Sequence, residues 1–269
     1  MAAAGGPCLV VFARAPVAGQ VKTRLCRPDP DSGPGARVLT AEQAARVHAA
    51  FVADVCRSGA RSGIPRRRLY VAGDKAHPEL QQLAGEHGFT LCAQHGAELG
   101  ARMDAAITAE LGQGASSVVL IGTDSPTLPT AYLQRAAAWL GGDAEVVLGP
   151  AADGGYYLIG ARRPIPELFA TGISWGTAQV LPATLLRLQS LRDRGVRVAL
   201  LPFFYDVDTP QDLRLLLAHL RLSGPGHADH VGDDLAAPQA LTAPHVPATY
   251  AALQSLGFLD ADQTQLPEN

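Results

Sequence analysis

Short apolar runs alternate with amphipathic stretches along residues 8–221. Each run has the length of a strand, and the stretches between them repeat their apolar residues at helical spacing. This alternation is typical of βαβ units on a largely parallel sheet. The pattern therefore predicts an α/β fold with seven strands, at Cys8–Ala13, Arg68–Ala72, Phe89–Ala93, Ser117–Gly122, Ala144–Leu148, Tyr156–Gly160 and Val196–Phe203.

Two helices have clear start signals. Thr40 and Gln43 form a capping box before a helix that runs to about residue 59. Thr209, Pro210 and Asp212 supply a cap, a first-position proline and an acidic first turn. Further helices are expected at 98–111, 130–140 and 177–194, with a weak helical pattern at 248–256.

The composition of the chain changes at residue 223, after which Pro, Gly, His and Asp are frequent. With 269 residues, 47% of them hydrophobic, the chain is long enough for one large core. We predict a single domain over residues 1–222 and a C-terminal tail over 223–269, to which the sequence assigns no role. One antiparallel element is expected around residues 156–160.

Charge and cysteine content exclude several classes of partner. Twenty-two cations against 25 acids give a net charge of −3, so no basic footprint for nucleic acid or an anionic membrane is present. No apolar run approaches the ~18 residues of a membrane span. Cys8, Cys26, Cys56 and Cys92 form no C-x-x-C pair, as expected of reduced thiols. These features predict a cytoplasmic protein with small-molecule partners; its oligomeric state stays open.

Cations cluster in the loop after the first predicted strand. Arg14, Gly19, Lys22, Thr23 and Arg24 lie within eleven positions, and only two of the 22 cations in the chain are lysines. Free backbone N–H groups beside three cations suit a polyphosphate. The loop is not a Walker A motif, since two residues separate its glycine from the lysine. An ordinary βα loop with surface arginines is the alternative.

Aspartates follow two other predicted strands. Asp124 comes directly after the fully apolar run 118–121, and Asp206 and Asp208 follow the apolar segment 198–204. Ligands of open α/β sheets bind beyond the carboxyl ends of strands, and Mg²⁺ takes one or two carboxylates. These acids are candidate metal ligands. The alternatives are a turn at Ser125-Pro126 and helix capping by the Asp-x-Asp pair.

A glycine-rich segment supplies a candidate for a second substrate. Asp153, Gly154, Gly155 and Tyr156 lie between two apolar runs. The glycines permit close approach of backbone to a ligand, and the aspartate is able to bind a ligand hydroxyl. A plain β-hairpin turn explains the same residues equally well.

Six motifs, in this order, resemble the DUF2064 family. They are FARAPVAGQVKTRL at 12–25, ELGARM at 98–103, IGTDSP at 121–126, GPAADGGYYLIG at 149–160, SWGT at 174–177 and DVDTPQDL at 206–213. Members of that family are described as glycosyltransferase-like proteins related to phospholactate guanylyltransferases and, more distantly, to molybdopterin nucleotidyltransferases. The resemblance implies a GT-A-like, nucleotide-diphospho-sugar transferase fold: a three-layer sandwich on a mostly parallel sheet.

The resemblance also implies roles for residues. Lys22, Asp124 and Asp208 correspond to catalytic positions, the two aspartates as a metal pair with Asp206 as an accessory ligand. Lys22 and Arg24 correspond to phosphate ligands and Arg102 to a position near the nucleotide; from the cation-rich loop itself we add Arg14, Gly19 and Thr23 to the phosphate side. Asp153, Gly154 and Gly155 match a loop that lines the acceptor side, to which we add Tyr156 and Trp175.

The reaction implied is a transfer that depends on Mg²⁺ or Mn²⁺. We expect a nucleotide sugar to glycosylate a small acceptor. The alternative is a nucleotidyltransferase that joins a nucleotide to a phosphorylated acceptor and releases pyrophosphate. A third hypothesis is that the protein is not an enzyme and binds a partner through a degenerate GT-A fold.

Overall fold

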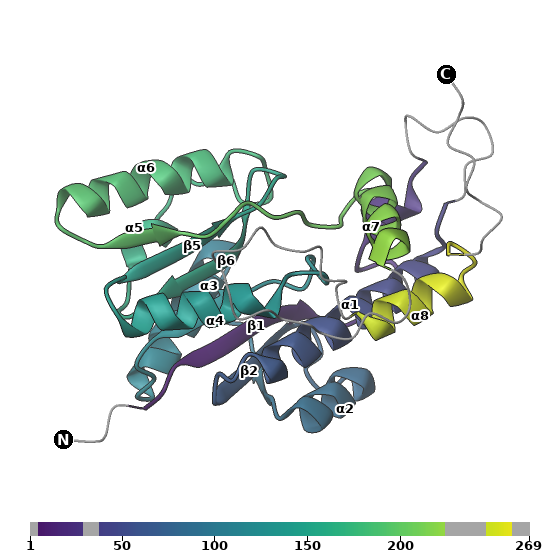
Figure 1. The fold of residues 1–269 in the computed structure, drawn as a ribbon, viewed down its shortest axis with the longest axis horizontal. Helices are drawn as coiled ribbons and strands as arrows, with labels where there is room; N and C mark the ends of the chain where they lie inside the picture. Colours follow the sequence, from purple (N-terminus) through teal and green to yellow (C-terminus); the bar gives the residue numbers. More distant parts are fainter. Residues whose placement is uncertain (1–4, 29–37, 224–245, 260–269) are drawn as a thin grey trace. The chain divides into compact units, whose positions relative to one another are not determined.

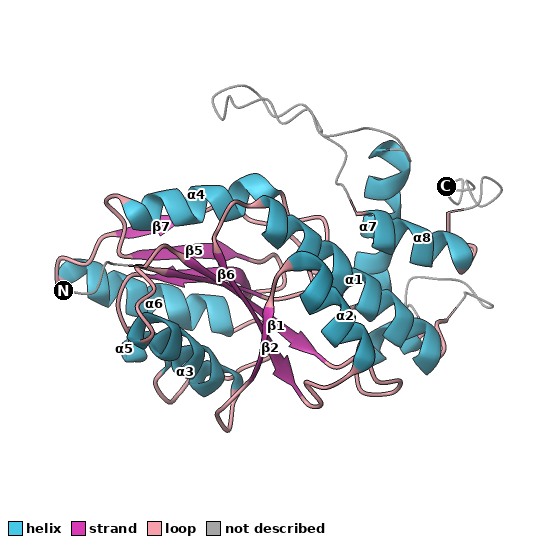
Figure 2. Cartoon of the chain, turned by 90° about the horizontal axis from the view of Figure 1, so that it is seen from below, coloured by secondary structure: helices cyan, strands magenta, loops and turns pink. Residues whose placement is uncertain are grey.

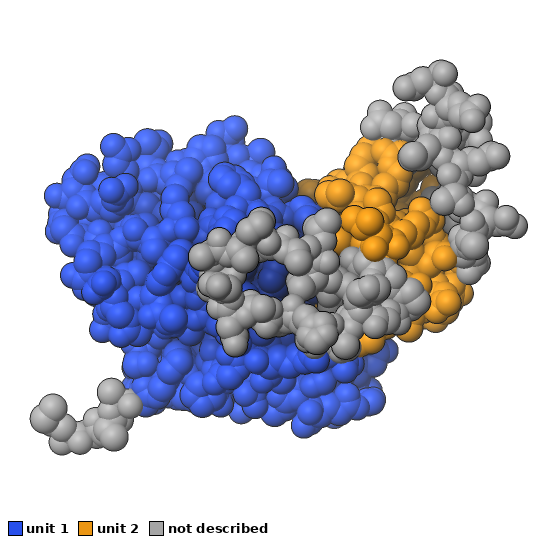
Figure 3. Space-filling view, viewed as in Figure 1, with its two compact units in different colours: residues 1–15, 55–206 blue, residues 16–54, 207–269 orange. Residues whose placement is uncertain are grey.

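The computed structural model describes residues 5–28, 38–223 and 246–259. The chain divides into two compact units (Figure 3): unit 1 comprises residues 1–15 and 55–206, and unit 2 comprises 16–54 and 207–269. This division differs from the predicted boundary at residue 222, which stays a prediction.

Unit 1 is built on a seven-stranded sheet (Figure 1). The order across the sheet is β3-β2-β1-β4-β6-β5-β7. All seven predicted strands form, and each pairs with a neighbour on the sheet. Their bounds are β1 Cys8–Arg14, β2 Arg66–Ala72, β3 Thr90–Ala93, β4 Val118–Ile121, β5 Val146–Pro150, β6 Tyr156–Ala161 and β7 Val198–Leu200.

The sheet is mostly parallel, as predicted. Among the described strands, only β6 runs against its neighbours, pairing antiparallel with both β4 and β5. Five residues join β5 to β6, a link too short for a parallel crossover. The expected antiparallel element at residues 156–160 is therefore confirmed.

Helices cover both faces of this sheet (Figure 2). One face packs on α3 (Leu99–Gly112), α5 (Pro166–Phe169) and α6 (Val180–Asp193), which share a core with β1, β4, β5 and β6. The opposite face packs on α4 (Thr130–Gly141). A further helix, α2 (Pro78–His87), precedes β3. The predicted three-layer α/β architecture is confirmed.

Two expectations for unit 1 need correction. Strand β7 is shorter than predicted because Pro202 has no N–H for the ladder, although Leu201 and Phe204 still donate backbone bonds to β5 residues. The sequence analysis also missed α2 and α5. Only Leu80 and Ala84 of α2 are buried, which leaves a weak amphipathic signal.

Unit 2 is helical. It contains the 3₁₀ turn η1 (Thr23–Cys26), the first part of α1 (Ala41–Arg61), α7 (Pro210–Ser223) and α8 (Pro247–Ser255). The predicted capping box of α1 is present: the Gln43 backbone N–H donates to Thr40 Oγ1 at 3.2 Å, and the Thr40 N–H donates to Gln43 Oε1 at 2.9 Å. No described helix combines the length and apolarity needed to cross a bilayer.

Helix α8 lies within the segment expected as a tail, and it is anchored to α1. Asp54, 1% exposed, accepts hydrogen bonds from the backbone N–H groups of Ala248 (3.1 Å) and Thr249 (2.6 Å). The carboxylate therefore satisfies donors that the first turn of α8 leaves open. Thr249 and Leu253 are both fully buried, so α8 is part of the packed core of unit 2.

Candidate functional site

The carboxyl end of β4 brings together two of the predicted motifs. All four residues of β4 are buried, and Asp124 lies half-buried just beyond them. Its neighbour Ser125 donates a side-chain hydrogen bond to the carboxylate of Asp206. Thr127 donates to the Tyr205 hydroxyl at 2.9 Å, which ties the same two segments together again. Asp206 is thereby held beside the segment that carries Asp124.

The donors at this strand end are hard oxygen atoms, the type that Mg²⁺ and Mn²⁺ prefer. No group of three or more His, Cys, Asp or Glu side chains in the described part of the chain is arranged to hold a metal. Mg²⁺ commonly takes only one or two carboxylates and fills its shell with phosphate oxygens and water. The donor set formed by Asp124 and Asp206 fits that requirement.

A second set of predicted residues meets in unit 2. Lys22 Nζ donates to Asp208 Oδ1 at 2.8 Å and to the Val207 carbonyl at 2.7 Å. The ammonium also lies 5.4 Å from the centre of the Phe51 ring. Only 3% of the lysine side chain is exposed, against 37% for Asp208. The structure thus joins two residues that lie 186 positions apart in the sequence.

This pairing bears on the predicted phosphate loop. The Lys22 ammonium is already engaged with a carboxylate, whereas Arg24 Nη1 lies 4.0 Å from Asp208 Oδ2 and is 59% exposed. Lys22 also has a left-handed backbone, with φ 47°, at the start of η1. Because the Arg24 guanidinium is exposed and the Lys22 ammonium is buried, Arg24 is better placed than Lys22 to bind an anion.

Asp212 is a site residue that the sequence analysis assigned only to capping. Its Oδ2 accepts from the Asp208 N–H at 3.0 Å and from the Thr209 N–H and hydroxyl, both at 2.7 Å. These bonds hold the backbone that carries Asp208. The signal in the sequence that identifies Asp212 is the Thr-x-x-Asp spacing at 209–212. This spacing is that of a capping box with aspartate in the acidic position.

Of the remaining phosphate-side residues, Arg14, Gly19 and Thr23 are exposed and Arg102 is half-buried. Arg14 lies at the end of β1, and Thr23 begins η1. Gly19 has φ 76°, a conformation that favours glycine, in the turn before Lys22. Arg102 lies on α3 and donates from Nε to the Gly96 carbonyl at 3.0 Å, so one of its donors closes the loop before the helix.

The predicted acceptor-side segment forms a turn held by α6. Asp153 Oδ1 accepts the Gly155 N–H at 2.8 Å, as the hairpin alternative anticipated. The Gly154 carbonyl accepts the Leu181 N–H at 2.7 Å, from the first turn of α6. A Cβ at Gly154 would lie 2.6 Å from Ala178, and φ there is 89°, so only glycine fits.

Two aromatic residues of the acceptor side both contact α3. The Tyr156 hydroxyl donates to Met103 Sδ at 3.7 Å. The Trp175 ring packs so closely on Gly100 that a Cβ there would lie 2.3 Å from the indole. Gly100 and Met103 are three positions apart and therefore share one face of the helix. The motifs at 98–103, 156 and 174–177 thus converge on α3.

The tyrosines around these segments stay neutral. Burial is the main cause that raises the pKa of Tyr156, Tyr157 and Tyr205 above the usual value near 10. Tyr132 and Asp206 raise the pKa of Tyr157 further. At physiological pH these hydroxyls therefore keep their protons.

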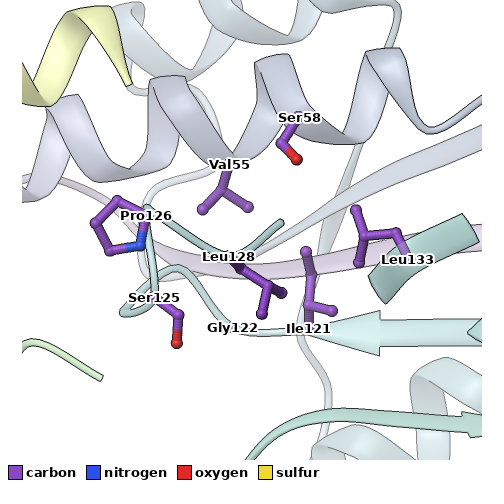
Figure 4. A pocket seen from close by; sticks show the side chains of 8 residues that line it. All are labelled: Val55, Ser58, Ile121, Gly122, Ser125, Pro126, Leu128 and Leu133. Atoms are coloured by element: carbon purple, nitrogen blue, oxygen red, sulfur yellow. The ribbon is translucent and has the colours of Figure 1, made fainter. Parts of the chain in front are cut away.

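A small hollow lies behind the Asp124 segment (Figure 4). Its two hydroxyls are already paired, Ser58 with Thr130 at 2.8 Å and Ser125 with Asp206. The rest of the lining is mainly aliphatic and offers nothing to a phosphate. We interpret the hollow as a gap between α1 and β4; its lining residues are Val55, Ser58, Ile121, Gly122, Ser125, Pro126, Leu128 and Leu133.

Residues 55–177 match the DUF2064 family, described as "Uncharacterized protein conserved in bacteria", which confirms the resemblance for the motifs at 98–103, 121–126, 149–160 and 174–177. The motifs at 12–25 and 206–213 lie outside the matched residues. A protein from Desulfovibrio desulfuricans G20 described as a "putative nucleotide-diphospho-sugar transferase" is 29% identical in its solved structure, with a TM-score of 0.70 over 93% of this chain and 96% of that one.

Two further solved structures share the fold at lower identity. A cytidylyltransferase from Leptospira borgpetersenii has a TM-score of 0.51 at 10% identity, over 98% of this chain and 99% of that one. A 4-diphosphocytidyl-2C-methyl-D-erythritol synthase from Anaerococcus prevotii also has a TM-score of 0.51, at 11% identity, over 81% and 97%. A search among curated proteins finds no match.

Proposed function

We propose that this chain, which matches DUF2064 over residues 55–177, is a metal-dependent transferase that uses a nucleotide-activated substrate. The observation that carries the proposal is the hydrogen bond from Ser125 to Asp206, which sets Asp206 beside the Asp124 segment at the carboxyl end of β4. In open α/β sheets this end of a strand is where ligands bind. The likeness to the Desulfovibrio protein over almost the whole chain supports the same class of function.

Asp124 and Asp206 would hold Mg²⁺ or Mn²⁺. When bound, the ion would supply Lewis-acid stabilisation of charge on the phosphate oxygens. Arg24, exposed beside the Lys22–Asp208 pair, would bind a phosphate oxygen directly. We assign Lys22 to holding Asp208, and Asp212 to holding the backbone of that residue.

Glycosyl transfer from a nucleotide sugar to a small acceptor is our first choice, because the name of the Desulfovibrio protein denotes that class of donor. An acceptor hydroxyl oxygen would bond to the anomeric carbon, and the bond from that carbon to the phosphate oxygen would break. The nucleoside diphosphate leaves with the bonding electron pair, and the acceptor proton passes to solvent. Asp153 to Tyr156 and Trp175 would form the acceptor side.

Nucleotidyl transfer is the second candidate. The Lys-Thr-Arg loop at 22–24 and the segment 206–210 resemble those of nucleotidyltransferases, and the fold is shared with two cytidylyltransferases. In that reaction an acceptor phosphate oxygen attacks the α-phosphorus of a nucleoside triphosphate. Pyrophosphate leaves in place of a nucleoside diphosphate.

A thermal-shift panel of nucleotides and nucleotide sugars, with and without Mn²⁺, tests the proposal. We expect at least one nucleotide to raise Tm when Mn²⁺ is present. Asp124→Asn and Asp206→Asn should remove the Mn²⁺-dependent part of that rise. Asp193→Asn, which changes an exposed aspartate at the end of α6, should leave it unchanged. No shift with any nucleotide would favour the non-catalytic partner-binding protein.

Product analysis separates the two transfers. The protein is incubated with candidate acceptors and with separate pools of nucleoside triphosphates and nucleotide sugars. Release of a nucleoside diphosphate with a glycosylated acceptor supports the first choice. Release of pyrophosphate without sugar transfer would replace it with the second.

A further inference from the structure

Arg187 of α6 makes an unusual set of contacts with the backbone of a neighbouring segment. Its Nη1 donates to the carbonyls of Glu167, Leu168 and Ala170 at 3.3, 3.2 and 2.8 Å. Its Nη2 donates to the Thr171 carbonyl at 2.8 Å. One guanidinium therefore binds two carbonyl groups of the last turn of α5 and the two that follow the helix, a role that suits its planar fork of donors.

The segment that Arg187 holds leads directly to Trp175. Gly172 turns the chain with φ 96°, and the buried Ile173 fixes the next position. The Trp175 N–H then donates to the Ile173 carbonyl at 3.1 Å, and the indole packs on Gly100 of α3. Three residues thus separate Thr171, which carries the last carbonyl that Arg187 binds, from the tryptophan.

The same helix holds the other half of the acceptor side. Leu181, in the first turn of α6, donates to the Gly154 carbonyl, and Arg187 lies near enough to Tyr156 for its charge to act on that hydroxyl. Helix α6 is therefore a common support for the turn at 153–155 and for the segment that ends at Trp175. A support of this kind holds a binding surface in one geometry before the substrate arrives.

We propose that Arg187 is a positioning residue that keeps Trp175 packed on α3 and so presets the acceptor side of the transferase, an inference that rests on the function proposed above. Arg187 touches neither the Asp124 segment nor Asp206 in the described contacts of unit 1. Its effect should therefore be confined to the acceptor side and leave the nucleotide side intact.

Tryptophan fluorescence gives a test that does not depend on activity. The chain has two tryptophans, so Trp139→Phe leaves Trp175 as the only indole reporter. In that background, Arg187→Met should raise the acrylamide quenching constant of Trp175 by about twofold or more, because local opening exposes the indole. The quenching constant of Arg187→Lys should lie between those of Arg187→Met and the protein with Arg187, because one ammonium cannot span four carbonyls. Arg192→Met, an exposed arginine of the same helix, is the matched control and should cause no change.

Nucleotide binding provides the second readout. The Mn²⁺-dependent thermal shift with nucleotide should be the same size in Arg187→Met as in Arg192→Met. Equal quenching in these two variants would overturn the proposal, and so would loss of the nucleotide shift in a folded Arg187→Met protein. If the unmodified protein binds no nucleotide, the function proposed above fails while the quenching result still decides whether Arg187 positions Trp175.

Discussion

Removal of the Asp54 carboxylate should loosen α8 and lower the stability of unit 2. The carboxylate is 1% exposed and accepts two backbone N–H bonds, at 2.6 and 3.1 Å. In Asp54→Ala both donors lose this acceptor in a site from which water is excluded.

The size of the effect follows from these contacts. Hydrogen bonds to a charged group contribute about 1.5–3 kcal/mol each, and loss of a helix cap costs about 0.5–2 kcal/mol. Because the two estimates describe the same bonds, we expect Asp54→Ala to cost about 2–4 kcal/mol. Asp54→Asn keeps one acceptor oxygen but loses the charge, so we expect it to lower stability by about 1–2 kcal/mol.

The assay combines thermal unfolding with hydrogen exchange. For a chain of this size about 2–4 °C of Tm corresponds to 1 kcal/mol, so Asp54→Ala should lower Tm by roughly 5–15 °C. Exchange should accelerate most in the amides of α8. Gln254→Ala, an exposed position on the same helix, should change stability by less than about 0.5 kcal/mol. An unchanged Tm together with unchanged exchange in α8 would refute the assignment of Asp54 as its anchor.

Three further predictions concern unit 1. Glu110→Gln should cost about 2–4 kcal/mol in urea unfolding, because a fully buried carboxylate loses its ion pair with Arg68 at 3.2 Å; an unchanged midpoint would contradict it. Gly100→Ala should destabilise the protein by about 1–3 kcal/mol, because the added Cβ meets the Trp175 ring. In a protein that already carries Trp175→Ala, the same change should be neutral or stabilise by about 0.5 kcal/mol. A double-mutant cycle that finds no coupling between the two positions would reject that contact. Burial raises the pKa of the Cys56 thiol from 9.0 to about 12. The unfolded chain therefore loses this proton at lower pH than the folded protein, and stability should fall as pH rises from about 9 to 12. Cys56→Ala should flatten that fall in denaturation midpoints measured across this pH range.

The sequence alone was informative wherever a structure depends on neighbours in the chain. Apolar runs predicted all seven strands, and the signal was strongest for β1, β4 and β5, which are buried almost throughout and are therefore apolar. The Thr40 and Gln43 capping box marked the start of α1 correctly, since both partners lie within one turn. The hairpin turn that the sequence offered as an alternative at Asp153–Gly155 is a similarly local feature, and it leads into the antiparallel strand β6.

The sequence also predicted which residues carry chemistry, but not which of them meet. It treated Lys22 as a phosphate ligand, whereas the fold buries its ammonium against Asp208 and leaves Arg24 exposed. It paired Asp124 with Asp208 as metal ligands, whereas the described contacts tie Asp206 to the Asp124 segment through Ser125. The metal and catalytic roles themselves stay predictions.

Only the tertiary structure could decide these pairings. Lys22 and Asp208 are 186 positions apart, Asp54 and Thr249 are 195 apart, and nothing in the residues between them specifies the contact. Charged and polar side chains are common on any surface, so a motif gives their chemistry but not their partner or exposure. Burial decides both, because a cation or carboxylate removed from water must be paired with whatever the packed helices and strands bring beside it.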